Sequence, residues 1–357
     1  MTRFFEDIER QPRELSTIAQ RAVADDAAAY RQAAELLARH SIIYIVGMGA
    51  SWHAGMAIAA YLHARGRVAL LFDAAELLHH GKIAEGSCVL LLSRSGKSKE
   101  LVDLAAQLRS QNIPIVAVTN DAQSPMALAS NCVVALGVPF DHNVSVTMYS
   151  GIALAGCLLA ALTCGESLPG ICSMLIAALN GVRDRIPEWA RAIETSGWLA
   201  VDAPYYFLGR GAGMASATEA RLLWEEATKS AATALTTAGF RHGPQEIVRE
   251  ALRVALWLDS AHMEREDLLL AADLRSLGAN VLLIGQQAND ATRDLLLEIP
   301  RIDPEWQFVV DIIPIQIAAE RLAALAGRDC DSFRLCSYVV TSEGGLGLAD
   351  PQNEEPR

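Results

Sequence analysis

Residues 41–49, SIIYIVGMG, form a continuous apolar run that ends in a glycine pair and leads into a helical pattern. Residues 205–211, YYFLGRG, repeat this arrangement 162 positions later, counted from Gly47 to Gly209. A second matching pair, LRS at 108–110 and LRS at 274–276, precedes further apolar runs with an offset of 166. Repetition at a nearly constant offset indicates two similar structural units that follow each other along the chain.

Apolar runs that alternate with helical patterns predict an α/β fold with parallel sheets covered by helices on both faces. The expected divisions are helices at 1–35 with a break at Pro12, a first unit at 36–166, a helical connector at 167–198, a second unit at 199–335 and a tail at 336–357, frayed from 350 onward. The expected strands are 42–46, 67–72, 87–92, 113–119, 132–135, 205–208, 253–258 and 280–284, and the expected helices are 51–65, 98–110, 147–163, 213–230, 264–276 and 312–326.

The composition excludes several classes of protein. Of 357 residues, 30 are Lys or Arg and 42 are Asp or Glu, a net charge of −12, and 52% are hydrophobic. A disordered chain is excluded, and a large buried core is expected. A general nucleic-acid binder is excluded because it needs clustered basic residues to neutralise phosphates. An anionic small molecule stays compatible, since a site can be locally favourable inside an acidic protein.

The compartment signals favour a cytoplasmic protein. Residues 1–15 are charged and hold no apolar signal-peptide core, so no secretory leader is expected. The seven cysteines form no CxxC pair, which predicts reduced, buried thiols and argues against zinc. Residues 143–165 carry no charge and are long enough to span a bilayer. Their polar residues and glycines favour a buried helix instead, so no membrane partner is expected.

Residues 93–98, SRSGKS, follow an apolar strand and open a predicted helix. Their hydroxyls, the free backbone N–H groups and the helix dipole would favour an anion such as a phosphate. Gly96 would allow the backbone to approach the ligand closely. The segment differs from the GxxxxGK[ST] loop, so nucleotide hydrolysis is not predicted. The alternative is an ordinary helix start that Ser93 or Ser95 caps.

The turn Gly47-Met48-Gly49 has a second interpretation. It is similar to a dinucleotide-binding loop, and Asp73 ends the next strand where a ribose-binding acid would lie. The third glycine of that motif is replaced by Trp52, and the turn recurs in the second unit, which a single dinucleotide site does not explain. A nicotinamide-dependent dehydrogenase is therefore kept only as a minor alternative.

Glu225, Glu226 and the loop FRHGP at 240–244 form a candidate acid–base pair. Adjacent helical residues point about 100° apart, so only one of the two glutamates can face a given site. The alternatives are a solvated helix face with an ion pair between Glu226 and Lys229, and a His242 held by backbone contacts. The pair His79-His80 lacks a ligating partner and is interpreted as surface, as are the charges of the N-terminal helices.

Together these segments resemble the tandem sugar isomerase (SIS) family over essentially the whole chain. Its similar members are the isomerase domain of glucosamine-6-phosphate synthase, aminosugar-phosphate deaminases and isomerases, and fructosamine-phosphate deglycases. The matching segments are 6–12 (EDIERQP), 49–55 (GASWHAG), 93–98 (SRSGKS), 144–147 (VSVT), Glu219, Glu226 and 241–244 (RHGP).

The resemblance implies two SIS domains, each a five-stranded parallel sheet between helices, and an obligate homodimer with a shared active site. Glu226 would move a proton between C1 and C2 of a phosphorylated ketose or amino sugar, with a pKa raised by burial. His242, from the neighbouring subunit, would assist ring opening. No cofactor and no metal is expected. The substrate-binding residues would be Gly49, Ala50, Ser51, Ser93, Arg94, Ser95, Ser98, Val144, Ser145 and Thr147.

Three positions depart from the family pattern. Leu223, Tyr338 and Met148 stand where family enzymes carry lysines, so a Schiff base has no nucleophile in the expected places. Lys229, one turn from Glu226, is a candidate substitute. The departures favour a second function, an SIS protein that binds a sugar phosphate without turnover. No glutaminase domain is recognised in the sequence, so ammonia release from glutamine is not expected. The sequence identifies neither the sugar nor the choice among isomerase, deaminase and deglycase.

Overall fold

The computed structural model describes residues 1–286 and 295–346, whose strands form two five-stranded parallel sheets. The first sheet has the order β2-β1-β3-β4-β5 and the second, read from its other edge, β7-β6-β8-β9-β10. The strands are β1 (Ile42–Gly47), β2 (Val68–Asp73), β3 (Ser87–Ser93), β4 (Ile115–Thr119), β5 (Cys132–Ala135), β6 (Tyr205–Gly209), β7 (Ala232–Thr236), β8 (Arg253–Trp257), β9 (Asn280–Gly285) and β10 (Leu295–Glu298).

The two sheets repeat one topology, because counting the second set from β6 gives the same strand order as the first. The glycine turns match as well. Gly49 and Gly211 both have a φ of +49°, a conformation that favours glycine. A Cβ on Gly47 would lie 2.8 Å from the backbone of the following helix, and one on Gly209 2.5 Å from its helix. The repeat expected from the sequence is therefore a structural duplication, and the α/β parallel fold is confirmed.

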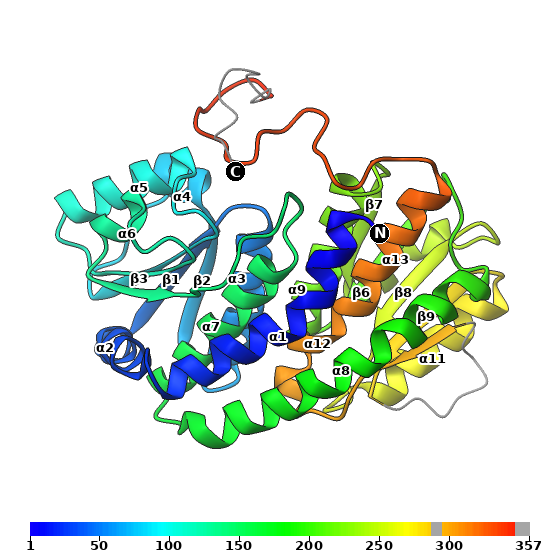
Figure 1. The fold of residues 1–357 in the computed structure, drawn as a ribbon, viewed down its shortest axis with the longest axis horizontal. Helices are drawn as coiled ribbons and strands as arrows, with labels where there is room; N and C mark the ends of the chain where they lie inside the picture. Colours follow the sequence, from blue (N-terminus) through cyan, green and yellow to red (C-terminus); the bar gives the residue numbers. More distant parts are fainter. Residues whose placement is uncertain (287–294, 347–357) are drawn as a thin grey trace.

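Helices cover both faces of each sheet (Figure 1). The inner faces of the two sheets share one hydrophobic core, whereas each outer face has a core of its own. The inner helices are α1 (Arg3–Val23), α2 (Ala27–Ala38), α3 (Ala50–His63), α7 (Thr147–Thr163), α8 (Leu168–Ser196), α9 (Gly213–Glu226), α12 (Phe308–Asp311) and α13 (Ile313–Leu325). The outer helices are α4 (Ala74–His80), α5 (Lys99–Ser110), α6 (Pro125–Ala129), α10 (Thr237–Arg241) and α11 (Glu264–Ser276), and the 3₁₀ helices are η1 (Pro244–Ile247) and η2 (Pro304–Trp306).

The uncharged segment at 143–165 forms the central helix α7, as expected for a buried helix. Every residue of α7 except Leu162 is buried. It packs closely on α3, since a Cβ on Gly156 would lie only 2.1 Å from the Ile58 side chain. Within the described part of the chain, no helix is long and apolar enough to cross a membrane.

Several local predictions were wrong. Pro12 lies inside α1, which continues to Val23, and the break between the leading helices comes at 24–26. The predicted helix at 312–326 matches α13, but the short helix α12 before it was not expected, and the helix predicted at 213–230 ends early, at Glu226. Strands β7 and β10 were not expected. Asp350–Arg357, expected to be frayed, lies outside the described residues.

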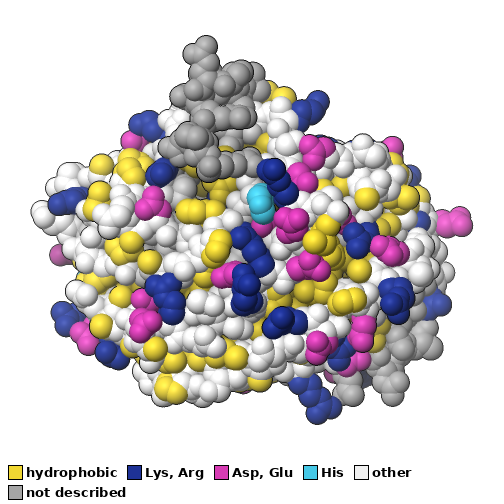
Figure 2. Space-filling model, in the orientation of Figure 1, with side chains coloured by type: hydrophobic (Ala, Val, Ile, Leu, Met, Phe, Trp, Pro, Cys, Tyr) yellow, Lys and Arg dark blue, Asp and Glu magenta, His cyan; other side chains and the backbone are white. Residues whose placement is uncertain are grey.

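The surface also differs from two expectations. The charges of α1 are not all solvent-facing, because Asp7 is only 1% exposed and Glu14 is buried as well. All seven cysteines are free, but Cys336 is exposed, Cys164 is partly buried, and only the other five are fully buried as predicted. Figure 2 shows positive and negative side chains interspersed over the face that it displays.

Candidate active site

The loop after β3 carries the predicted phosphate-binding hydroxyls at the carboxyl edge of the first sheet. The Ser93 hydroxyl accepts a hydrogen bond from the Gly96 N–H at 3.0 Å, and the Ser95 hydroxyl accepts one from the Lys97 N–H at 3.2 Å. Gly96 has a φ of +64°, and a Cβ there would lie 2.0 Å from the hydroxyl oxygen of Ser124. The loop is therefore a tight turn that only glycine fits at its centre.

The start of α5 has no side-chain cap. Ser98 is the N-cap residue, and its hydroxyl makes no capping hydrogen bond. The alternative in which Ser93 or Ser95 caps the helix is wrong, because both hydroxyls bond within the turn. The N–H of Lys99 donates to the Val340 carbonyl at 3.1 Å, so the segment after α13 crosses this helix start.

The two basic residues of the loop have different partners within the chain. Arg94 donates to the carbonyls of Asn143 at 2.9 Å and Tyr338 at 2.6 Å, and its guanidinium lies 4.0 Å from the centre of the Tyr338 ring. Lys97 is exposed, and its ammonium lies 3.6 Å from a carboxylate oxygen of Asp121. Arg94 therefore joins the loop to two neighbouring segments in addition to supplying charge.

The first glycine turn brings Gly49, Ala50 and Ser51 to the start of α3, beside the second unit. A Cβ on Gly49 would lie 4.0 Å from the Leu222 side chain of α9. Asp73, the residue behind the dehydrogenase alternative, accepts hydrogen bonds from the N–H groups of Ala75 and Glu76 at the start of α4. This carboxylate therefore has a local capping role, which weakens that alternative.

The predicted pocket loop with Val144, Ser145 and Thr147 is buried and is held by a residue that sequence reasoning missed. The Asp141 carboxylate accepts hydrogen bonds from the N–H groups of Val146, Thr147 and Met148 at the start of α7, at 2.8–3.1 Å. The α7 N-terminus is thus capped within the chain. The Thr147 hydroxyl is buried and has no hydrogen-bond partner among the described residues.

Helix α1 positions this loop. Arg10 lies 2.9 Å from the Asp7 carboxylate and 3.2 Å from that of Asp141. Asp7 also accepts from the backbone N–H of His142 at 2.8 Å, and its other carboxylate oxygen lies 2.9 Å from the His142 ring. Burial raises the pKa of Asp7, followed by the charge of Asp141. The charges of α1, Asp7 and Arg10 among them, were interpreted as solvated helix faces. Their spacing along the helix does not indicate that they contact Asp141 and His142, more than 130 positions away.

Glu226 ends α9 as a partly buried carboxylate that makes no hydrogen bond with the described side chains or backbone. Burial, followed by the charge of Glu219, raises its pKa to about 8, while Arg94 acts in the opposite direction. The neighbouring Glu225 is exposed and pairs with Arg221 at 2.5 Å. Only one of the two glutamates faces the interior, as the helical spacing predicted.

A buried pair between the units lies two helical turns before Glu226. The Nδ1 atom of His53 on α3 is 2.7 Å from a carboxylate oxygen of Glu219 on α9, and the residues are 2% and 1% exposed. Burial lowers the pKa of His53 to about 3 and raises that of Glu219 well above its usual value. The seven-residue spacing of Glu219 and Glu226 indicated that both lie on one side of α9. The contact between Glu219 and His53 on α3 was not predicted.

The three positions where family enzymes carry lysines hold side chains without an amine. Leu223 and Met148 are fully buried, and Tyr338 lies over Arg94. The Lys229 ammonium donates to the carbonyls of Glu226 at 2.8 Å, Asp329 at 2.5 Å and Ser332 at 3.0 Å. Lys229 therefore secures the end of α9 to the chain after α13. The expected ion pair with the Glu226 side chain was wrong, and the substitute role of Lys229 stays a prediction.

His242 follows α10 on an exposed loop. Its backbone N–H bonds to the Gly239 carbonyl at 3.2 Å, but its imidazole makes no hydrogen bond or ion pair with the described residues. The structure of this one chain does not bring it into contact with Glu226. Of the predicted site residues, those of the three loops and Glu226 gather where the two units meet, and His242 stays apart.

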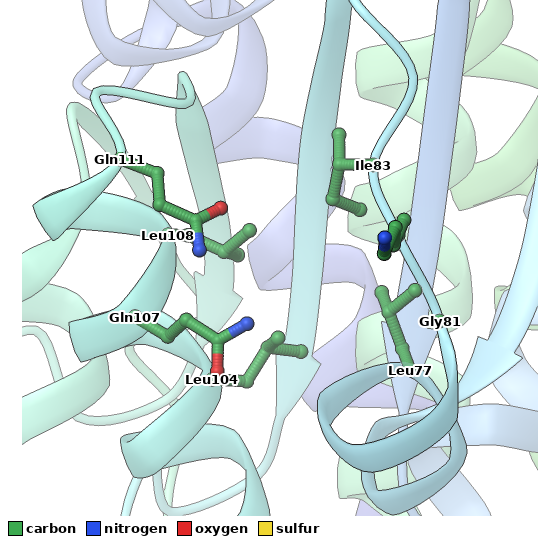
Figure 3. Close-up of a pocket in the computed structure, with 8 residues that line it drawn as sticks. Leu77, Gly81, Ile83, Leu104, Gln107, Leu108 and Gln111 are labelled. Atoms are coloured by element: carbon green, nitrogen blue, oxygen red, sulfur yellow. The ribbon is translucent and has the colours of Figure 1, made fainter.

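A cavity of ≈ 360 Å³ lies elsewhere, between α4 and α5 (Figure 3). Leu77, Leu104 and Leu108 form its apolar walls, and the amides of Gln107 and Gln111 point into it from α5. Leu77 belongs to α4 and the other residues lie along α5 or at its C-cap, whereas the hydroxyl loop precedes α5. The cavity is therefore separate from the candidate site. Among residues 1–286 and 295–346, no three His, Cys, Asp or Glu side chains are grouped as metal ligands.

The fold and the hydroxyl loop define a duplicated α/β protein with a candidate anion site at one sheet edge. Residues 36–164, which hold the first sheet, match the model of the SIS domain. The chain is 26% identical over 346 residues to the glutamine–fructose-6-phosphate aminotransferase (isomerizing) of Pyrobaculum aerophilum, covering 94% of this chain and 57% of that protein. It is 25% identical over 331 residues to that of Pseudomonas aeruginosa, covering 87% and 53%. The chain thus spans about half the length of these curated relatives.

Solved structures share the whole fold. The C-terminal domain of glucosamine-fructose-6-phosphate aminotransferase from Francisella tularensis superposes with a TM-score of 0.82 at 18% identity, over 93% of this chain and 98% of that one. Glucosamine-6-phosphate deaminase from Thermotoga maritima gives 0.78 at 19%, over 95% and 99%. Tagatose-6-phosphate ketose/aldose isomerase from Escherichia coli gives 0.79 at 23%, over 92% and 94%. At these identities the likeness establishes the fold.

Proposed function

We propose that the chain is a sugar-phosphate isomerase, deaminase or deglycase that transfers a proton between C1 and C2 of a phosphorylated ketose or amino sugar. In this proposal the second sheet belongs to a second SIS domain, at 199–335, and the first domain extends over 36–166. The relation to sugar-phosphate enzymes at the level of the family supports the substrate class.

The observation that carries the proposal is the Glu226 carboxyl. A base that removes a proton next to a carbonyl and returns it must change protonation near neutral pH, and the Glu226 pKa of about 8 fits this requirement. The carboxyl makes no hydrogen bond within the described chain, so it is free to meet a substrate. The charge of Arg94, a residue of the hydroxyl loop, acts on the Glu226 carboxyl, which supports a site shared by the two.

The phosphate would be held at the start of α5. The Ser98 hydroxyl makes no capping hydrogen bond, and Ser93 and Ser95 present hydroxyls beside it. A helix N-terminus favours an anion through its dipole and through those N–H groups that have no partner, which here do not include the Lys99 N–H bonded to Val340. Recognition of this kind requires no basic patch, in agreement with the net charge of −12.

His242 would act in the site of a second subunit of a homodimer. Its imidazole is exposed and unpaired in the described chain, as expected for a residue that functions elsewhere. We also assign the protein to the cytoplasm, because its free cysteines suit a reducing compartment.

One observation favours binding without turnover as the second candidate. No lysine lies at the three expected positions, and Lys229 is engaged by backbone carbonyls. An enzyme that opens the sugar through a Schiff base would need a free amine. Proton transfer through an enediol needs no lysine, so this observation separates two mechanisms and leaves the substrate class unchanged.

The test is incubation with a panel of hexose 6-phosphates, amino-sugar phosphates and fructosamine phosphates in deuterated water, followed by NMR. We expect deuterium at C1 or C2 of at least one sugar. Thermal stabilisation by several of them without any deuterium exchange would overturn the enzymatic proposal in favour of binding alone. Failure of every sugar phosphate to bind would overturn both.

A further inference from the structure

The second unit has a cavity of its own at the carboxyl edge of its sheet. The cavity measures ≈ 230 Å³ and lies where β6 and β8 end, between the turn Arg210–Gly213 and the loop 257–262. The duplication makes these segments the counterparts of the glycine turn and the hydroxyl loop of the first unit. Tyr61 of α3 closes the cavity from the first unit, and Asp311 lines it from α12.

Two polar side chains in the cavity have unused hydrogen-bonding capacity. Asp311 is 0% exposed; one carboxyl oxygen accepts from the Ser216 hydroxyl at 2.5 Å, and the other has no partner among the described residues. The Ser260 hydroxyl oxygen is buried and also lacks a described partner. A buried polar atom without a hydrogen-bond partner is destabilising, so a bound molecule that satisfies both groups would be stabilised.

The cavity differs from its counterpart in charge. The Asp259 carboxylate accepts from the N–H groups of Ala261 at 3.2 Å and His262 at 3.3 Å, where the first unit uses neutral serine hydroxyls. Arg210 lines the cavity, but the buried Asp267 carboxylate bonds to its Nε atom at 2.7 Å and offsets its charge. A phosphate would therefore meet the negative charge of Asp259 beside an Arg210 whose own charge Asp267 already offsets.

We propose that this second cavity binds a small, uncharged polyhydroxy molecule, an unphosphorylated monosaccharide. Burial raises the pKa of Asp311 to about 8, so its carboxyl is mostly protonated at neutral pH and can donate to a sugar hydroxyl. Ser260 can donate and accept, and the rings of Tyr61 and Trp257 add apolar surface. The cavity is smaller than the ≈ 300–1,000 Å³ typical of drug-sized ligands, which suits a single sugar ring. The site goes beyond the proposed function, because it is distinct from the hydroxyl loop.

The test compares one serine from each unit by titration calorimetry. The variants are Ser260→Leu in the second cavity and Ser98→Leu at the start of α5, and the ligands are glucose, fructose, a hexose 6-phosphate and inorganic phosphate. We expect an unphosphorylated sugar to bind the wild type with a millimolar Kd, about 4 kcal/mol of binding free energy. Ser260→Leu should weaken it at least about tenfold, and Ser98→Leu should leave it unchanged while weakening the phosphorylated sugar.

Ala261→Trp serves as a second variant, because Ala261 is exposed at the edge of the cavity and its replacement needs no change in the core. It should weaken the same ligand, and circular dichroism confirms folding of each variant. Three results would overturn the proposal: no heat from any unphosphorylated sugar up to about 50 mM, binding that survives both cavity variants, or displacement of the sugar by inorganic phosphate. None of them depends on turnover at Glu226, so the two proposals fail separately.

Discussion

Glu226 illustrates how burial changes the chemistry of one residue. Glu226 and Glu225 are adjacent in sequence, yet Glu226 is partly buried and has a pKa raised to about 8, whereas Glu225 is exposed and pairs with Arg221. Desolvation disfavours the charged carboxylate, and the charge of Glu219 adds to that effect. The two side chains therefore provide a test and its matched control.

Glu226→Gln should lower turnover by at least about 10²-fold, because the amide cannot accept the proton, while binding of the sugar phosphate changes little. Glu225→Gln makes the same side-chain change one position away and should leave turnover near that of the wild type. Proton exchange followed by NMR measures turnover, and calorimetry measures binding. Equal losses in the two variants would contradict the assignment of Glu226 as the base.

The pH dependence of turnover follows from the same pKa. Only the carboxylate can remove a proton, and at pH 7 about a tenth of the Glu226 side chains are ionised when the pKa is about 8. We expect kcat/KM to rise with pH up to about 8 and then to level off, since this profile reports the free enzyme. A profile that is flat between pH 6 and 8 would contradict this expectation.

Asp311 predicts a pH dependence of stability. Its pKa rises from 3.8 to about 8 because it is buried, so the folded state binds more protons than the unfolded state between these values. Its contribution to the free energy of unfolding is therefore fully present below about pH 4 and is lost as pH rises through 8. Asp311→Asn should lose less stability than the wild type between pH 5 and pH 9, measured by urea denaturation. Equal losses would show that Asp311 titrates normally.

At the scale of elements, the hydroxyl loop depends on one glycine. Gly96 combines a φ of +64° with a Cβ position 2.0 Å from the Ser124 hydroxyl, whereas Gly86 has a φ of +74° and no neighbour within 4 Å. Replacing Gly86 by alanine tests the energetic cost of the positive φ alone. Replacing Gly96 tests that cost together with the steric clash between the added Cβ and Ser124.

Gly86→Ala should cost about 1–2 kcal/mol of unfolding free energy, the price of a left-handed conformation for alanine. Gly96→Ala should cost more, because Ser124 must also move, and it should weaken sugar-phosphate binding, which Gly86→Ala should leave unchanged. Thermal denaturation and calorimetry measure the two effects. If Gly96→Ala costs no more than its control, the turn is looser than described.

At the scale of the whole molecule, the proposed homodimer predicts complementation between two inactive variants. If each site takes Glu226 from one subunit and His242 from the other, a mixed dimer of Glu226→Gln and His242→Ala subunits keeps one intact site. Random mixing after unfolding and refolding should then restore about a quarter of the wild-type activity, because half the dimers are mixed and half their sites are intact. Activity that stays at the level of the separate variants would place both residues in the same chain's site.

Much of the fold could be predicted, because local patterns determine it. Continuous apolar runs predicted eight of the strands, and the β6–β7 pairing was missed because β7 (ATALT) is a half-buried edge strand with little hydrophobic signal. The break at Pro12 was wrong because packing of α1 in the shared core maintains a helix through a residue that disfavours it. The site loops were predicted by their glycines and serines, whose conformational and hydroxyl chemistry is local.

The sequence by itself determined the duplicated α/β units, the glycine turns and the hydroxyl loop, since each depends on residues within a few positions of one another. Only the tertiary structure decided the hydrogen-bond partners and the pKa values of the site side chains. It paired His53 with Glu219 across 166 positions, capped α7 with Asp141 and turned Arg94 toward Tyr338. It also raised the Glu226 pKa to about 8. These properties depend on burial and on charges brought together from distant segments, and no local pattern encodes them.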